Sequence, residues 1–396
     1  MNILYYLGTF PKLSESFILN EIYELEQSGH NVAVCAKNEP NSKITHEEFD
    51  QLDIPIQYLD LPSVTDTTEL LSTKILQPQV LKHARYRAPL KHHATYLFRA
   101  KRCIEFINDL GWDLNHVHSH FATRSKFTGR YVASHFGVPF TLTAHAAGLY
   151  KEPIGDHTTD LLQSADRIVT ISEYNRQYIQ EQFTNKTPID IVRAGIRPEK
   201  FSPTESTVDN RILTIARFVE KKGHIYALEA VAEAVDDIPE IEYHIIGSGR
   251  LEEQLKRTVS DLGIKENVVF LSNVDDQKLL QELDEASCFL LPCVIAESGD
   301  RDGIPVALME AMAMKTSPIS TTVSGVPELI DHEVNGLLVE PRDSKKTAGA
   351  IVRLLQNDEK FSEYAKQARE TIVRNFNISS EANELESVFK KARLSN

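Results

Sequence analysis

The sequence predicts an α/β protein made of two Rossmann-like, doubly wound domains that face each other across a hinge. The chain has 396 residues, of which 41% are hydrophobic, so it can bury two cores of ordinary size. Short apolar runs alternate with segments of helical periodicity, which is the pattern of βα units on a parallel sheet. A polar segment at 193–210 with two prolines interrupts this pattern and marks the expected hinge.

The strands are expected in two sets, one on each side of this hinge. The first set comprises 2–7, 31–35, 116–119, 140–143 and 167–171, and the second comprises 211–215, 241–246, 267–271, 287–291 and 317–320. Each run is rich in apolar and β-branched residues and is followed by a helix-patterned segment. The first domain is therefore expected at 1–197 and the second at 205–377.

Composition and targeting signals limit the class of protein. A formal net charge of -14 argues against nucleic-acid partners. The four cysteines, Cys35, Cys103, Cys288 and Cys293, form no CxxC pair, so reduced and buried thiols are expected. The N-terminus lacks the charged region of a signal peptide, and no stretch approaches the ~20 apolar residues of a membrane span. We expect a cytoplasmic protein, soluble or peripheral on the inner face of the plasma membrane.

The stretch "ESGDRDGIPVALMEAMA" is the main candidate for ligand binding. It follows the expected strand 287–291 and suits a loop that leads into a helix starting near Pro305 and ending near Lys315. The helix start would lie at the carboxyl edge of the sheet, where free amides attract phosphate. Because Pro305 has no N–H, the amide donors would come from Gly303, Ile304 and Val306.

Two carboxylates in this stretch suit the ends of one elongated ligand. Asp302 lies in the loop and Glu310 in the helix, which separates them by roughly 7–8 Å along the axis. Carboxylates accept hydrogen bonds from vicinal hydroxyls, so one could read a hexose and the other a ribose, with a diphosphate between them. The alternative is that Asp302 caps the helix and Glu310 faces solvent.

Cations for such a diphosphate follow the first strand of the second domain. Arg217 ends that strand, and Lys221 and Lys222 precede a glycine in "ARFVEKKG". Arginine clamps two phosphate oxygens and lysine adds a point charge, although an exposed basic turn is the alternative. Gly247 begins a Gly-Ser-Gly turn that lacks the third glycine of a dinucleotide fingerprint, so we interpret it as backbone that lines a donor site.

The first domain offers candidates for the acceptor side. Gly8 follows the first strand, Ser14 is expected to cap the next helix, and Glu15 is either an acceptor contact or an ordinary helix-start carboxylate. His120 ends "HVHSH", which places three histidines on one strand face; a core or ligand-facing role is favoured over a metal. His145 directly follows a strand and is expected at the ligand edge or as a hydrogen-bonded loop histidine.

The span 82–102 is rich in lysine, arginine and histidine and contains no acid. In an acidic chain this composition predicts either contact with an anionic membrane surface or acceptor, or a solvated basic helix pair.

The motifs together resemble a known family over essentially the whole chain. "ARFVEKKG", "IIGSGRLEEQL", "DGIPVALMEAMAMKTSPIST", "VSGVPELI" and "NGLLVEPRD" resemble, in order and spacing, the retaining, GT-B-fold glycosyltransferases of glycosyltransferase family 4. "FPKLSESFILNEI", "HSHFA" and "FTLTAHA" are most similar to its exopolysaccharide and colanic-acid branch. Two positions depart from the family: Asp302 replaces the first glutamate of the Glu-x7-Glu motif, and Ser324 replaces the first glycine of a Gly-Gly pair.

The resemblance implies a role for each candidate. Arg217 and Lys222 would bind the donor diphosphate, Glu310 the ribose, and Asp302 the hydroxyls of the transferred sugar. Val274 would lie beside the nucleobase and His145 near the anomeric carbon. The resemblance also implies that the C-terminal helix, about 378–396, returns to the first, acceptor-binding domain.

The implied reaction is transfer of a hexose from a nucleoside diphosphate sugar, best assigned as a UDP-hexose, to an acceptor hydroxyl with retention at the anomeric carbon. A lipid-linked oligosaccharide is the implied acceptor, and neither a cofactor nor a metal is expected. The alternatives are a non-hydrolysing sugar-nucleotide epimerase and a non-catalytic two-domain ligand-binding protein. The sequence does not fix the nucleobase, the sugar, the acceptor or the oligomeric state.

Overall fold

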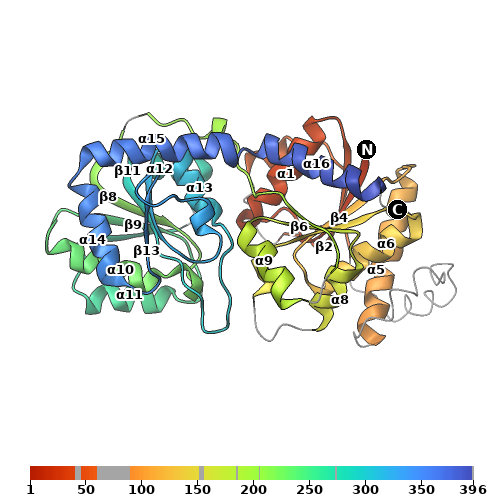
Figure 1. Ribbon diagram of the computed structural model, residues 1–396, viewed down its shortest axis with the longest axis horizontal. Helices are drawn as coiled ribbons and strands as arrows, with labels where there is room; N and C mark the ends of the chain where they lie inside the picture. The colour runs from red at the N-terminus through yellow and green to blue at the C-terminus, as the bar shows by residue number, and fades with distance from the viewer. Residues whose placement is uncertain are drawn as a thin grey trace. The chain divides into compact units, whose positions relative to one another are not determined.

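The chain folds into two compact units, each built on one parallel sheet (Figure 1). The computed structural model describes residues 1–40, 46–59, 90–150, 156–183, 186–204, 206–272 and 274–394. The first unit comprises Met1–Arg193 and Ile378–Asn396, and the second comprises Ala194–Asn377. In the described part of the chain, no helix is long and apolar enough to cross a membrane.

The first unit contains a seven-stranded parallel sheet in the order β3-β2-β1-β4-β5-β6-β7. Its strands are β1 (Asn2–Thr9), β2 (Asn31–Asn38), β3 (Ile56–Tyr58), β4 (His116–His120), β5 (Phe140–Ala144), β6 (Arg167–Thr170) and β7 (Ile189–Ile191). Its helices are α1 (Ser16–Gln27), α2 (Glu47–Asp50), α5 (Leu90–Asp109), α6 (Phe127–Phe136), α7 (Ala146–Leu149), α8 (Asp156–Ser164), α9 (Glu173–Gln182) and α16 (Ile378–Leu394). Successive residues of β1 enter different cores: Tyr5 packs with α1, whereas Leu4 and Tyr6 pack on the opposite face.

The second unit contains a six-stranded parallel sheet in the order β10-β9-β8-β11-β12-β13. Its strands are β8 (Val208–Ile215), β9 (Glu242–Ile246), β10 (Val268–Leu271), β11 (Ala286–Leu291), β12 (Ser317–Thr321) and β13 (Leu337–Val339). Its helices are α10 (His224–Val235), α11 (Glu252–Asp261), α12 (Asp276–Glu285), α13 (Val306–Ala313), α14 (Ser344–Leu355) and α15 (Asp358–Asn375). Separate apolar clusters cover the two faces of this sheet.

The last helix, α16, packs in the first unit beside α1 (Figure 1). Leu385, Val388 and Phe389 join the apolar cluster between α1 and the sheet, and the Phe389 ring stacks on His116 with 4.1 Å between ring centroids. The Glu381 carboxylate accepts a 2.7 Å hydrogen bond from the Arg193 amide, at the end of the unit's first segment. Two segments distant in sequence therefore complete one core.

The predicted α/β class with two parallel sheets is confirmed, and two local predictions are wrong. Ser14 lies in a short 3₁₀ turn, and α1 begins after Glu15 with no side-chain cap. The helix expected from Pro305 to Lys315 is shorter, because Pro305 is its N-cap and the helix ends at Ala313. Lys315 adopts a φ of 59°, in the left-handed region that ends helices.

Candidate functional site

Two loops meet at the carboxyl edge of the second sheet. The turn Glu220–Lys222 follows β8, and the loop 292–305 follows β11. The Val294 amide donates a 3.0 Å hydrogen bond to the Lys221 carbonyl, and the Glu297 amide donates a 2.9 Å bond to the Glu220 carboxylate. These contacts fix the lysine pair against the loop that carries Asp302. Ligands of open α/β sheets bind at this edge.

Asp302 is ion-paired with both lysines. Its carboxylate lies 2.7 Å from Lys222 Nζ and 3.3 Å from Lys221 Nζ, and Lys221 also lies 3.1 Å from Asp300. The Asp302 and Lys222 side chains are only 15% and 13% exposed, and Lys221 is buried. The alternative of an exposed basic turn is therefore wrong for Lys221 and Lys222. The N-cap of α13 is Pro305 and no side chain caps this helix, so the alternative of a helix-capping Asp302 is wrong as well. The sequence did not single out Asp300 for a role, because its carboxylate could not be told from solvated loop acids.

Opposite charges keep this cluster ionised. Burial alone would raise the pKa of Asp302. The Lys222 and Lys221 ammonium groups have the opposite and larger effect, so its pKa is lowered to about 2. Burial lowers the pKa of Lys222, while the Asp302 carboxylate raises it by more, against the opposing charge of Arg217. The Cys293 thiol lies 3.8 Å from Asp302, and burial with that neighbouring charge raises its pKa to about 12. The thiol is therefore neutral at physiological pH.

The ion pair predicts a specific dependence of stability on pH. Because the folded pKa of Asp302 is depressed, its contribution is complete above its unfolded pKa and is lost as pH falls towards 2. The raised pKa of Lys222 preserves the pair up to strongly alkaline pH. We expect Asp302→Asn to lower the free energy of unfolding by about 2 kcal/mol between pH 5 and 9. Urea titrations should show this difference shrink below pH 4, and a difference that grows there would contradict the assignment.

The start of α13 offers unpaired backbone donors beside this cluster. The amides of Gly303, Ile304 and Val306 donate no hydrogen bond to any described residue, and the Gly303 carbonyl accepts one from the Gly325 amide at 3.2 Å. Glu310 is the fifth residue of α13 and is half-buried. Free amides at a helix start and a carboxylate about one turn further along suit a ligand with a phosphate and hydroxyl groups.

The remaining candidates of the second unit lie at the same edge of the sheet. Arg217 follows β8 and is exposed. A Cβ atom at Gly247 would lie 2.0 Å from the Ala216 carbonyl oxygen, so only glycine fits this packing. Val274 follows β10 and is partly buried against the core. The chain thus brings the predicted donor-site residues to the ends of β8, β9, β10 and β11.

In the first unit, the acceptor-side candidates Gly8, Ser14 and Glu15 lie at the end of β1 and in the turn before α1. Gly8 lies near the end of β1 with open space around its Cα, since a Cβ there would meet nothing within 4 Å. Ser14 and Glu15 lie in the short turn before α1, and Glu15 is ion-paired with Lys12. These residues carry no contact that distinguishes an acceptor role from a structural one.

His120 and His145 belong to a buried hydrogen-bonded chain. His120 Nδ1 lies 2.9 Å from His145 Nε2, and His120 Nε2 lies 2.9 Å from Glu21 Oε1. Glu21 also accepts a 2.7 Å hydrogen bond from the Tyr5 hydroxyl. Sequence reasoning missed Glu21 because a glutamate within a helix is ordinarily a surface residue. Its position on the face of α1 that meets the strand with His120 was the only available signal.

Glu21, His118 and His120 could hold a metal ion by geometry, since one ligand atom of each lies within 4.8 Å of the others. However, His118 Nδ1 and Nε2 lie 2.7 and 3.0 Å from the Thr141 and Thr143 hydroxyls. Both ring nitrogens of each histidine are thus engaged in hydrogen bonds within the protein, which fits a polar network better than a metal centre.

The basic span 82–102 lies partly outside the described residues, which exclude 60–89. Within α5, His93 and Arg99 are buried, and His93 Nδ1 lies 2.6 Å from the Tyr131 hydroxyl. Lys101 and Arg102 are each ion-paired with Glu105 at 3.6 Å. In the described part of this span, these basic side chains are therefore buried or ion-paired within the first unit.

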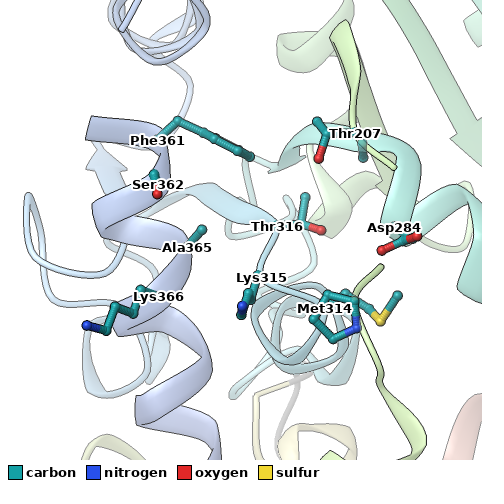
Figure 2. Close-up of a pocket in the computed structure, with 11 residues that line it drawn as sticks. Thr207, Asp284, Met314, Lys315, Thr316, Phe361, Ser362, Ala365 and Lys366 are labelled. Atoms are coloured by element: carbon teal, nitrogen blue, oxygen red, sulfur yellow. The ribbon is translucent and has the colours of Figure 1, made fainter. Parts of the chain in front are cut away.

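A separate pocket of about 290 Å³ lies in the second unit (Figure 2). Thr207, Thr316 and Asp284 line it together with Lys315 and Lys366. Thr207 and Thr316 directly precede β8 and β12, so the pocket lies at the amino edge of the sheet. Since ligands of such sheets bind at the opposite edge, we do not assign the donor site to this pocket.

The architecture is that of the GT-B class of glycosyltransferases. The structure of Anabaena HepE in complex with UDP matches 99% of this chain and 100% of its own length, with a TM-score of 0.76 and 15% identity. Sucrose-phosphate synthase from Thermosynechococcus elongatus matches over 100% of both chains, with a TM-score of 0.76 and 16% identity. At this level of identity the match establishes the fold.

Sequence comparison establishes the family. Residues 196–371 match the model for "Glycosyl transferases group 1", and residues 14–200 match "Glycosyltransferase Family 4". The amylovoran biosynthesis glycosyltransferase AmsK of Erwinia amylovora is 31% identical over 95% of this chain and 96% of its own. The putative colanic acid biosynthesis glycosyltransferase WcaL of Escherichia coli is 26% identical with the same coverage. The chain belongs to glycosyltransferase family 4.

Proposed function

We propose that the protein transfers a hexose from a nucleoside diphosphate sugar, best assigned as a UDP-hexose, to an acceptor hydroxyl with retention at the anomeric carbon. The observation that carries this proposal is the cluster of Lys222, Lys221 and Asp302 beside the free amides at the start of α13. A diphosphate would receive hydrogen bonds from the amides and charge stabilisation from Arg217 and Lys222. Asp302 would then bind the hydroxyls of the sugar and Glu310 those of the ribose.

In the proposed reaction, the acceptor oxygen forms a bond to the anomeric carbon as the bond from that carbon to the diphosphate oxygen breaks. The acceptor proton passes to a donor phosphate oxygen on the same face. Negative charge grows on the leaving diphosphate, and the cations and amides of this edge stabilise it without a metal. Gly247 and Val274 would line the nucleotide. His145 is proposed as a further catalytic residue.

The acceptor is proposed from the relatives. AmsK and WcaL carry names that place them in amylovoran and colanic acid biosynthesis, and HepE was crystallised with UDP and with UDP-glucose. We therefore propose a glycan of exopolysaccharide biosynthesis as the acceptor, and, from the family resemblance, a lipid-linked oligosaccharide as its form. An epimerase with the same fold would interconvert sugar nucleotides without any acceptor, and product analysis distinguishes the two.

A thermal-shift screen with UDP, GDP, ADP and their sugars tests the donor assignment. We expect one nucleoside diphosphate to raise the melting temperature by several degrees with EDTA present, because binding to the folded state stabilises it. Arg217→Ala and Glu310→Ala should reduce this shift while each variant keeps the melting temperature of the free protein. An undiminished shift in both variants, or a shift that EDTA abolishes, would contradict the proposed site.

A further inference from the structure

A chain of hydrogen bonds connects His145 to a buried carboxylate in the first unit. It runs from the Tyr5 hydroxyl in β1 to Glu21 in α1 at 2.7 Å, then to His120 at the end of β4 at 2.9 Å. It ends on His145, which follows β5, at 2.9 Å. His120 and His145 are 0% and 6% exposed. Residues of β1, α1 and β4 thus form one hydrogen-bonded chain that ends on the imidazole of His145, at the carboxyl edge of the sheet.

The donors and acceptors along this chain select one tautomer for each histidine. The Tyr5 hydroxyl and His120 Nε2 both meet Glu21 Oε1, and the carboxylate form of Glu21 accepts two such bonds. Burial raises the pKa of Glu21, while His118 and the Tyr5 hydrogen bond oppose this effect by favouring the carboxylate. If His120 donates from Nε2, its Nδ1 carries a lone pair and must accept. His145 Nε2 is then the donor to His120, and the proton of the neutral His145 ring is on Nε2.

The other ring nitrogen of His145 remains available. The His145 side chain makes no further hydrogen bond to any described residue, and its Nδ1 is absent from the buried polar atoms that lack a partner. In the tautomer selected above, Nδ1 carries a lone pair. This atom can therefore accept a hydrogen bond from a ligand hydroxyl.

Aromatic packing fixes the plane of the His145 ring. His120 stacks on it with 5.2 Å between centroids and 14° between planes, and Phe17 and Phe121 each approach within 4.8 Å. Phe121 adopts a φ of 69°, which costs a bulky residue about 1–3 kcal/mol. Such strain is retained where the surrounding structure holds it, and functional sites are common places for it.

Burial keeps both rings uncharged. It lowers the pKa of His120 to about 3, with a smaller contribution from the Lys126 charge. Burial also lowers the pKa of His145, and the neighbouring His120 adds to this effect. At neutral pH the rings are neutral, so the position of each single proton decides which atoms can accept.

We propose that Glu21 and His120 are positioning residues that hold His145 with its proton on Nε2, so that Nδ1 accepts a hydrogen bond from a hydroxyl of the sugar ligand. The role towards the sugar rests on the proposed glycosyl transfer. The tautomer does not rest on it, because it follows from the hydrogen bonds of the free protein.

Nuclear magnetic resonance of the protein with isotope-labelled histidine measures the tautomer directly. The His145 signals are assigned by their loss in His145→Gln. We expect the Nε2–H form for His145 in the wild type and in Glu21→Gln, which keeps an acceptor oxygen. In Glu21→Leu the Nδ1–H form should become populated. An Nδ1–H form of His145 in the wild type would overturn the proposal, even if the leucine variant does not fold.

Steady-state kinetics with a sugar nucleotide donor measures how the positioning of His145 affects turnover. Glu21→Leu should lower kcat about 10- to 100-fold with little change in KM, and Glu21→Gln should recover most of this loss. His116→Gln is the matched control, because His116 is equally buried on the same strand but contacts Thr141 and Phe389; its kcat should stay at the wild-type value. Equal kcat values in Glu21→Leu and the wild type would overturn the positioning role.

Two further outcomes separate this inference from the proposed function. If His145 shows the Nε2–H tautomer but the protein transfers no sugar from any donor, the hydrogen-bond assignment is supported and the proposed function is overturned. Stoichiometric zinc bound by the purified protein and lost in His118→Gln would overturn the proposed chain, because a metal on His118, His120 and Glu21 would displace these hydrogen bonds.

Discussion

Replacement of Lys222 by methionine is expected to lower kcat/KM for sugar transfer by about 10³ while the chain stays folded. Lys222 Nζ lies 2.7 Å from Asp302, beside the unpaired amides of α13. The methionine variant loses the point charge that would stabilise the leaving diphosphate, where charge is greatest in the transition state. Initial rates of nucleoside diphosphate release, with circular dichroism to verify folding, measure the effect.

Two controls separate the loss of function from the loss of an ion pair. Lys200 forms a comparable pair with Asp276 at 2.8 Å in the same unit, so Lys200→Met should leave kcat/KM unchanged. Combining Lys222→Met with Asp302→Asn removes both charges of the pair, which should reduce the stability defect without restoring transfer. If the double variant regains wild-type activity, Lys222 serves only to neutralise Asp302.

Gly223→Ala is expected to destabilise the second unit by more than about 4 kcal/mol. Gly223 has a φ of 70°, and a Cβ atom there would lie 1.8 Å from the Pro292 carbonyl oxygen, whereas real Cβ contacts essentially never fall below 3.0 Å. The residue lies between the lysine turn and the loop of Asp302, so the two loops must separate to admit a methyl group. Urea unfolding should show the loss of stability, and donor binding should fall with it.

Gly263→Ala is the matched control for this variant. Gly263 has nearly the same backbone conformation, with a φ of 73°, but a Cβ atom there would meet nothing within 4 Å. Gly263→Ala should lower the free energy of unfolding by only about 1–2 kcal/mol, because alanine disfavours the left-handed conformation. If the two alanine variants lose equal stability, backbone conformation alone explains the Gly223 effect and the close approach of the two loops is not important.

Prediction from sequence succeeded for strands that are buried on both faces. All ten predicted strands are present. Most are central strands of parallel sheets, which form continuous apolar runs, and β10 is an edge strand whose apolar run Val268–Leu271 nevertheless made it recognisable. Among the described residues, the strands that were missed, β3, β7 and β13, are edge strands of three residues each. They are short and mostly half-buried, so no apolar run distinguishes them from loops.

The site was predictable where chain order determines it. Residues that follow the strands of a parallel sheet lie at the same edge of that sheet. The sequence alone therefore predicts that Arg217, Lys222 and Asp302 lie at one edge. The pairing of Lys222 with Asp302 depends on how two loops pack, and sequence spacing carries no information about that. The backbone conformation of Ser324 was also not predictable from its residue type. Ser324 adopts a φ of 52°, in the left-handed region that glycine favours and that residues with a side chain rarely adopt.

The return of α16 to the first unit affects how the protein forms during synthesis. The second unit is one continuous segment, whereas the first requires Ile378–Asn396 in addition to its first 193 residues. On the ribosome, where domains generally fold as they emerge, α16 is synthesised only after the whole second unit. Until then the surface that α16 covers, including Ile18 and Leu19, stays exposed, so the domain that is translated first is completed last.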